Sequence, residues 1–183
     1  MKGLQGKRAL VTGGSSGIGQ AIAIRLGEEG IDVAINYVGP PEGAEETRDA
    51  IEHGVQMCMK QLSAGGTKPL LVAADVSDAG QVEQMFAEVT EQYGGIDILI
   101  NNAGIQIAQD THELPVERFD KVLAVNLRGA FLCAQQAIRS WITDERPGCV
   151  VNVSSVHQVI PKPRFVGYSV SKGGMQNLSL IHI

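Results

Sequence analysis

The stretch TGGSSGIG, residues 12–19, constrains this 183-residue chain more than any other part of its sequence. It follows a short apolar run and precedes an amphipathic segment, 17–29, that we expect to be helical. Glycine has no Cβ, so the backbone can turn tightly and approach a phosphate closely. The following helix offers free N–H groups and a positive dipole end to a pyrophosphate. Alone this is compatible with a plain tight turn, but between a strand and a helix it indicates a dinucleotide site, which would use Gly13, Ser15, Ser16, Gly17, Ile18 and Gly19.

Short apolar runs alternate with longer amphipathic segments through the rest of the chain. The runs are continuously apolar, which is typical of strands buried on both faces. Repeated strand–helix–strand units predict an α/β fold with a parallel sheet and helices on both sides. The expected strands are 8–13, 31–37, 68–75, 96–104 and 148–155, and the expected helices are 17–29, 43–62, 78–94, 114–142 and one that carries Tyr168.

Residues after the second and third expected strands bear on how an adenosine would be held. An acid at the tip of the second strand would bind ribose hydroxyls and repel a 2′-phosphate, but the uncharged Asn36 and Tyr37 stand there. We therefore expect either NAD or NADP to be accepted, and we expect Asn36→Asp to favour NAD. Asp75, at the end of the third strand, either accepts a hydrogen bond from the adenine amine or caps the next helix, for which Ser77 and Asp78 are competing caps.

The overall charge and the cysteines exclude several classes of function. A net charge of −5 disfavours binding to nucleic acid and to anionic membranes. No apolar stretch is long enough to span a bilayer. Three widely separated cysteines, Cys58, Cys133 and Cys149, suit reduced, buried thiols in a cytoplasmic protein. The histidines and cysteines show no metal-ligand spacing, so we expect no metal site.

Several motifs occur in one order along the chain: TGGSSGIG, DV at 75–76, NNAG at 101–104, VNLRGAF at 125–131, and Ser155 followed by Tyr168 and Lys172. Together they resemble the short-chain dehydrogenase/reductase family over nearly the whole chain. The stretch at 154–175 is most similar to the glucose 1-dehydrogenases of that family, although Gln158 stands where those enzymes often carry Glu. The resemblance implies a Rossmann-type doubly wound parallel sheet in the order 3-2-1-4-5, forming one NAD(P)-binding domain over 1–183. It also implies a homotetramer.

Carried over position by position, the resemblance places the catalytic residues at Asn126, Ser155, Tyr168 and Lys172. A free phenol has a pKa of about 10, which is too high for a base at neutral pH. A lysine cation on the same helical face, about 4 Å away at an effective dielectric near 20, favours a phenolate by roughly 4 kcal/mol, or about three pKa units. An isolated Tyr-x3-Lys pair is more often a solvated helix face. Here the fifth strand delivers Ser154 and Ser155 to the sheet edge where open α/β folds bind ligands.

The other candidate residues have assigned roles and alternatives. Ser155 is expected to hydrogen-bond the reacting oxygen, whereas Ser154 is expected to be structural. Asn126, within an otherwise apolar helix, either orders a water that relays protons to Lys172 or bonds to backbone. His157 could touch substrate or lie in a surface loop. The resemblance implies cofactor contacts from Asp75, Val76, Asn102, Ala103, Gly104, Tyr168 and Lys172, although a strand-ending turn would also explain 102–104.

We therefore expect an NAD(P)-dependent oxidoreductase that moves a hydride between nicotinamide and a carbon of a small alcohol or sugar. The alternatives are a 3-ketoacyl-carrier-protein reductase and a catalytically silent nucleotide-binding fragment. Residues 53–68 look like an insertion before the third strand, and the final LSLIHI differs from the continuation that the family shows. We accordingly expect the chain to be incomplete at its C-terminus, without the family's last strands. By itself it is then expected to bind nucleotide weakly and to show negligible turnover.

Overall fold

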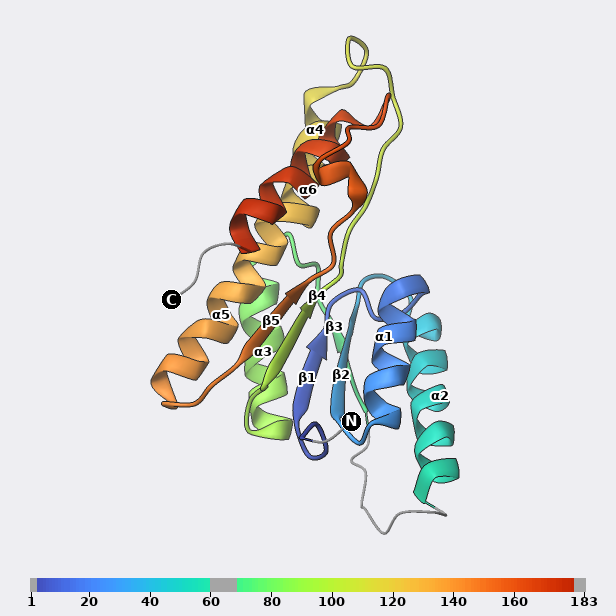
Figure 1. Ribbon diagram of the computed structural model, residues 1–183, viewed down its shortest axis with the longest axis vertical. Helices are drawn as coiled ribbons and strands as arrows, with labels where there is room; N and C mark the ends of the chain where they lie inside the picture. Colours follow the sequence, from blue (N-terminus) through green and yellow to red (C-terminus); the bar gives the residue numbers. More distant parts are fainter. Residues whose placement is uncertain (1–2, 60–68, 180–183) are drawn as a thin grey trace.

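A computed structural model describes residues 3–59 and 69–179 (Figure 1). Strands and helices alternate along the described chain as the sequence predicts. The strands are β1 (Arg8–Val11), β2 (Asp32–Tyr37), β3 (Leu70–Ala73), β4 (Ile98–Asn101) and β5 (Cys149–Asn152). The helices are α1 (Gly17–Glu28), α2 (Glu42–Met59), α3 (Ala79–Tyr93), α4 (Val116–Leu123), the π-helical turn η1 (Ala124–Arg128), α5 (Gly129–Thr143), the 3-10 turn η2 (Val156–Gln158) and α6 (Val166–Ser179).

The five strands form one parallel sheet in the order β3-β2-β1-β4-β5. This confirms the predicted fold class and strand order. All strand carboxyl ends therefore lie at one edge of the sheet, with β1 and β4 adjacent in the middle. The glycine loop after β1 and the NNAG segment at the end of β4 are brought together there, although about 90 residues separate them in the sequence.

Helices cover both faces of the sheet, as continuously apolar strands require. Successive residues of β1 point to opposite faces: Leu10 packs in the cluster under α3 and α5, whereas Ala9 and Val11 pack in the cluster under α1 and α2. In Figure 1, α1 and α2 lie on one side of the strands and α3 and α5 on the other. The two apolar layers hold the strand ends rigidly, which is what a site at the carboxyl edge needs.

The long helix expected at 114–142 is interrupted. It begins after Pro115, which has extended backbone angles at the N-cap, and its middle is the π-helical turn η1. Single π-turns inside α-helices are rare and are frequent at functional sites. Asn126 lies in this turn and is fully buried.

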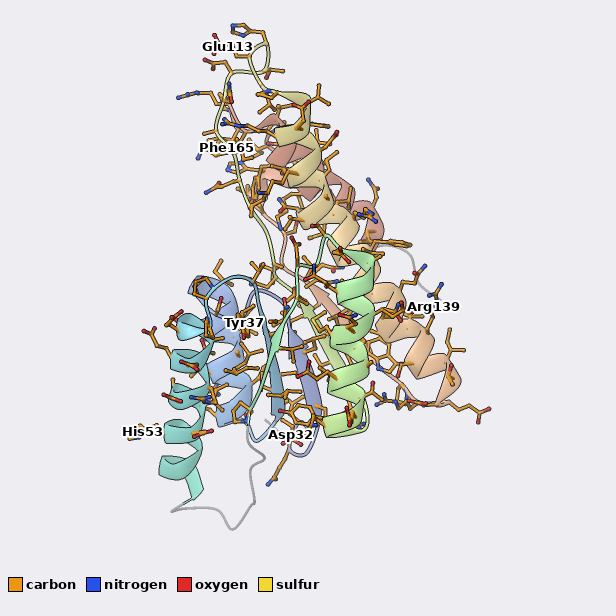
Figure 2. All side chains as sticks on the ribbon, turned by 180° about the vertical axis from the view of Figure 1, so that it is seen from behind. Asp32, Tyr37, His53, Glu113, Arg139 and Phe165 are labelled. Atoms are coloured by element: carbon orange, nitrogen blue, oxygen red, sulfur yellow. The ribbon has the colours of Figure 1, made fainter. Side chains whose placement is uncertain are left out.

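Two helices reach beyond the carboxyl edge of the sheet. Figure 1 shows α4 and α6 crossing there, above the ends of the strands. Figure 2 shows Glu113 and Phe165 at this end of the molecule, with Asp32 at the opposite end. Most of the insertion expected at 53–68 lies outside the described residues. Of the cysteines expected to be buried, Cys133 is buried, but Cys149 is exposed because it begins β5 at the edge of the described sheet. Within the described part of the chain, no helix has the length and apolar character to cross a membrane, and no group of three potential metal ligands is found.

Candidate functional site

The loop after β1 has the tight geometry that its glycines allow. Gly13 and Gly17 adopt φ angles of 62° and 54°, in the left-handed region that favours glycine. A Cβ at Gly19 would lie 2.2 Å from the Gly13 carbonyl oxygen and 2.4 Å from Asn102 Nδ2. The first turn of α1 is therefore packed directly on the loop, with no space for a side chain at Gly19. This leaves the helix N-terminus and the loop backbone in position for an anionic group.

The NNAG segment is hydrogen-bonded to this loop. The hydroxyl of Thr12 accepts hydrogen bonds from the backbone N–H groups of Asn102 and Ala103, both at 3.0 Å. The amide of Asn102 in turn donates to the carbonyl oxygens of Thr12 and Gly13, also at 3.0 Å. The loop after β1 and the loop after β4 are thus hydrogen-bonded to each other. They lie at the topological switch point between β1 and β4, which is where open α/β sheets bind ligands.

Helix α6 brings Tyr168 and Lys172 to the same edge. Lys172 is only 4% exposed, and its ammonium donates to the Val153 carbonyl at 2.7 Å. The ammonium lies 5.7 Å from the centroid of the Tyr168 ring. Burial lowers the pKa of Lys172 below its ordinary value. A lysine with this environment and a neighbouring phenol is the combination that acid–base chemistry at neutral pH needs.

A single pocket of about 730 Å³ joins these parts. The glycine loop, the NNAG segment and the pair Tyr168 and Lys172 all line it. Of the residues predicted from the sequence, those that line it are Gly13, Ser15, Ser16, Gly17, Ile18, Asn36, Asp75, Val76, Asn102, Ala103, Gly104, Tyr168 and Lys172. A pocket lined both by the glycine loop and by the polar side chains of Tyr168 and Lys172 fits an elongated phosphate-containing cofactor such as NAD(P).

Comparison with known proteins agrees with this geometry. The profile of the family described as short chain dehydrogenase matches residues 7–181, nearly the whole chain. The chain belongs to the short-chain dehydrogenase/reductase family.

Named relatives within this family act on different substrates. The chain is 40% identical over 176 residues to 3beta-hydroxysteroid dehydrogenase 1 of Eggerthella lenta, covering 96% of this chain and 63% of the relative. It is 38% identical over 179 residues to glucose 1-dehydrogenase 2 of Bacillus subtilis, covering 97% and 65%. The crystal structure of a short-chain type dehydrogenase/reductase from Mycobacterium marinum superposes with a TM-score of 0.85 at 32% identity, covering 96% and 65%. The chain thus spans less than two thirds of the length of these relatives.

The four residues that the family resemblance marks as catalytic are not equivalent in the structure. Tyr168 and Lys172 line the pocket, whereas Asn126 and Ser155 are not among its lining residues. The hydroxyl of Ser155 accepts a hydrogen bond from the His157 N–H at 3.2 Å, and it caps η2. This bond occupies a lone pair and leaves the hydroxyl proton available to a neighbouring oxygen.

Ser154, expected to be structural, lines the pocket, and its hydroxyl is already engaged. It donates to Gln158 Oε1 at 2.7 Å and contacts the Lys172 carbonyl at 3.4 Å. Gln158 therefore braces the strand end through Ser154. The rings of His157 and Tyr168 make a T-shaped contact, with their planes at 75° and their centroids 6.3 Å apart, and His157 Nδ1 is 2.9 Å from the Ile160 carbonyl.

The side chain of Asn126 makes the backbone contacts that were the alternative expectation. Its Oδ1 accepts from the Ile105 N–H at 2.7 Å, and its Nδ2 donates to the Ile105 carbonyl at 2.9 Å. The second Nδ2 proton goes to Ser171 Oγ at 3.0 Å. Both Nδ2 hydrogens are used inside the protein, which favours the backbone alternative for this side chain, and an ordered water between Asn126 and Lys172 stays a prediction. The amide holds the segment after NNAG against η1.

Asp75 and Asp78 divide the roles that the sequence left open. Asp78 caps α3 by accepting from the Gln81 N–H at 2.9 Å. The carboxylate of Asp75 closes a turn by accepting from the N–H and hydroxyl of Ser77, at 2.9 and 2.7 Å. Asp75 therefore does not cap the helix. It lies on the pocket wall with its second oxygen in no hydrogen bond that the described residues make, which is compatible with the expected adenine contact.

The end of β2 differs from the expectation for Asn36 and Tyr37. Asn36 is 2% exposed, and its amide donates to the carbonyls of Val72 and Ala74 at 3.3 and 2.9 Å. Its Oδ1 accepts from the Gly13 N–H at 3.2 Å. Asn36 thus braces the glycine loop from the side instead of offering a free amide to a ribose. Tyr37 packs against the apolar cluster under α1 and α2 and does not line the pocket.

Sequence reasoning missed eight lining residues: Val38, Ala74, Ile105, Gln106, Lys121, Val125, Val153 and Ser154, the last of these singled out in another role. Ile105 and Gln106 directly follow NNAG, and that proximity was a usable signal. Lys121 comes from α4 and depends on how this helix crosses the sheet edge, which no local pattern reveals. Val38 is 69% exposed at the end of β2, beside the buried Asn36.

We expect Gly19→Ala to weaken nucleotide binding about tenfold, which corresponds to about 1.4 kcal/mol. The added Cβ cannot be accommodated without moving Gly13 or breaking the Asn102 contact, so the phosphate-binding backbone must shift. Overpacking of this kind costs about 1–3 kcal/mol. Titration of NADH fluorescence measures the dissociation constant. Gly80→Ala on α3 is the control, because a Cβ there meets only Asp78 Oδ1, at 3.3 Å. Equal affinities of the Gly19→Ala protein and the wild type would contradict the role of this packing.

Cofactor choice should respond to residue 38 and not to residue 36. Asn36→Asp removes two donors and places a carboxylate against buried carbonyls, so we expect the free energy of unfolding to fall by about 2–3 kcal/mol. Val38→Asp puts the same charge at an exposed lining position and should weaken NADP relative to NAD by about tenfold, or 1.4 kcal/mol. Urea unfolding and the two dissociation constants test this. A stable Asn36→Asp protein with an altered NAD/NADP ratio would restore the original expectation.

Proposed function

We propose that the protein is an NAD(P)-dependent oxidoreductase that transfers a hydride between nicotinamide and the carbon of a secondary alcohol or sugar. One observation carries this proposal: Tyr168 and Lys172 line the same pocket as the glycine loop. A nucleotide held by the loop and NNAG would extend toward these two side chains. Because the chain spans less than two thirds of the length of the relatives named above, the activity is proposed for the protein as its source organism makes it.

Tyr168 would move the proton that accompanies the hydride. Bound nicotinamide supplies or accepts the hydride itself. The Tyr168 hydroxyl makes no hydrogen bond to another described residue, so it is free to bond the reacting oxygen. It would take the proton from an alcohol in oxidation and return it to a carbonyl oxygen in reduction. The hydroxyl proton of Ser155 would donate to the same oxygen and hold it near the phenol.

Lys172 would support this proton transfer electrostatically. Its bond to the Val153 carbonyl uses one of three ammonium hydrogens and fixes the group beside the Tyr168 ring. A second hydrogen faces Met175 Sδ at 3.9 Å, and the third can bond a ribose hydroxyl of the cofactor. A cation at this place favours the phenolate, and in a largely buried site the attraction is stronger than in water. Lys172 is thus proposed to act on Tyr168 and on the cofactor together.

The proposed substrate is a secondary alcohol or a sugar. The similarity to glucose 1-dehydrogenase 2 supports a sugar, and the similarity to 3beta-hydroxysteroid dehydrogenase 1 supports a larger alcohol. A 3-ketoacyl-carrier-protein reductase is the nearest competing activity. We also propose, from the family resemblance, a homotetramer and a cytoplasmic location. Light scattering and cell fractionation would test these two points.

The decisive assay has two parts. Fluorescence titration with NADH and NADPH measures binding. Formation or consumption of NAD(P)H is then followed with glucose, a panel of secondary alcohols, a 3β-hydroxysteroid and a short β-ketoacyl thioester. For the protein as its source organism makes it, we expect binding of at least one cofactor and turnover of about 1 per second or more with one substrate class. Binding without turnover across the whole panel would instead identify a catalytically silent nucleotide-binding protein.

A further inference from the structure

Ser171 is buried between the catalytic candidates without lining the pocket. It directly precedes Lys172 in α6, it is 0% exposed, and it is absent from the lining of the nucleotide pocket. Its hydroxyl donates to the Tyr168 carbonyl at 2.7 Å. The same oxygen accepts a hydrogen bond from Asn126 Nδ2 at 3.0 Å. Ser171 is therefore bonded both to the helical turn that carries Tyr168 and to the π-helical turn η1.

The contact with Asn126 extends this connection to the pocket floor. Asn126 holds both backbone polar groups of Ile105, and Ile105 lines the pocket immediately after Gly104. Gly104 itself approaches closely, since a Cβ there would lie 3.4 Å from Asn126 Oδ1. A continuous series of hydrogen bonds thus runs from the floor of the nucleotide pocket through Asn126 and Ser171 to the backbone of Tyr168.

Burial makes these hydrogen bonds depend on one another. Asn126 and Ser171 are both 0% exposed, so solvent cannot replace a lost partner at low cost. A serine hydroxyl bonding back to the preceding helical turn is common by itself. The unusual feature is that this hydroxyl also receives a donor from a different element, which fixes the rotation of α6 relative to η1. That rotation determines where the side chains of Tyr168 and Lys172 project.

We propose that Ser171 is a positioning residue for hydride transfer, whose hydroxyl sets the turn of α6 that carries Tyr168 and Lys172 relative to the pocket floor at Ile105. The inference rests on the proposed function. It assigns Ser171 no contact with substrate or cofactor. Displacement of a catalytic group by about 1 Å can lower a rate by about 100-fold, so loss of this hydroxyl should affect the chemical step more than binding.

The test compares Ser171→Ala with Ser169→Ala. Ser169 is also on α6 and is 8% exposed, but its hydroxyl accepts from the Lys162 N–H and makes no contact with Asn126. We expect Ser171→Ala to lower kcat about 10- to 100-fold, with the cofactor dissociation constant changed less than about threefold. Ser169→Ala should keep kcat within about threefold. Ser171→Cys keeps a weak donor and acceptor, so its kcat should lie between those of Ser171→Ala and the wild type. It also replaces Ser171→Ala in the test if the alanine protein does not fold.

Two outcomes overturn the proposal while leaving the function intact. One is a kcat for Ser171→Ala within threefold of a wild type that turns over. The other is an equal loss in Ser169→Ala, which would show that any buried hydroxyl of α6 has this effect. A wild type that binds NAD(P)H but turns over no substrate would overturn the proposed function, and with it this role of Ser171. The wild-type rate therefore separates the two failures.

Discussion

Tyr168→Phe should lower turnover by about 10³-fold, while the dissociation constant of the cofactor changes by less than about threefold. General acid–base groups contribute about 10²- to 10⁴-fold, and Tyr168 is the only tyrosine among the lining residues of the pocket. Phenylalanine keeps the ring, so the edge contact with His157 and the packing beside Lys172 should persist. The glycine loop, which carries most of the proposed phosphate contacts, is not touched.

Steady-state rates and NADH titration measure these two quantities. Tyr37→Phe is the matched control, because it removes a hydroxyl from a residue that packs on the core and does not line the pocket. It should leave kcat within about twofold. A Tyr168→Phe protein with turnover within tenfold of the wild type would show that another group transfers the proton.

Asn126→Asp should reduce the free energy of unfolding by at least about 3 kcal/mol. The substitution keeps the size of the side chain but removes both of its donors, leaving the Ile105 carbonyl and Ser171 Oγ without their partner. Each unsatisfied buried group costs about 1–3 kcal/mol, and the new carboxylate is buried as well. Residue 126 lies in the π-turn that joins α4 to α5. The substitution should therefore destabilise both helices where they meet beside the pocket.

The pH dependence of this loss gives an independent check. Burial without a cationic partner would raise the pKa of the introduced carboxyl above that in the unfolded chain. The folded form would then bind more protons, so the deficit relative to wild type should shrink as pH falls through that raised pKa. Asn177→Asp makes the same chemical change at an exposed position of α6 and should cost less than about 0.5 kcal/mol. Equal, pH-independent losses in the two variants would contradict the buried-network explanation.

Local sequence was sufficient for the features that depend on neighbours in the chain. The continuously apolar strands and the intervening amphipathic segments predicted a parallel sheet with two covered faces, because a strand buried on both sides cannot alternate in polarity. The glycines of 12–19 predicted a phosphate-binding turn, because other residues rarely adopt the backbone angles of such a turn and their side chains would prevent its close packing. The four-residue spacing of Tyr168 and Lys172 predicted a shared helical face for the same kind of reason.

The tertiary structure alone decided what the polar side chains touch. Asn36 was expected at the ribose, but its amide bonds to carbonyls of β3 and the loop after it, more than 30 residues away in sequence. For Asn126 either an ordered water or a backbone bond was expected, and its side chain holds Ile105 and Ser171, which lie 21 and 45 positions away. A short polar side chain can satisfy itself with any suitable group within about 3 Å, and its own sequence neighbourhood does not reveal which backbone groups are left open by the packing of distant elements. The sequence therefore determined the residue types of this site and the edge of the sheet where they gather, whereas the partners that hold each side chain in place were decided only by the way β2, η1 and α6 pack together.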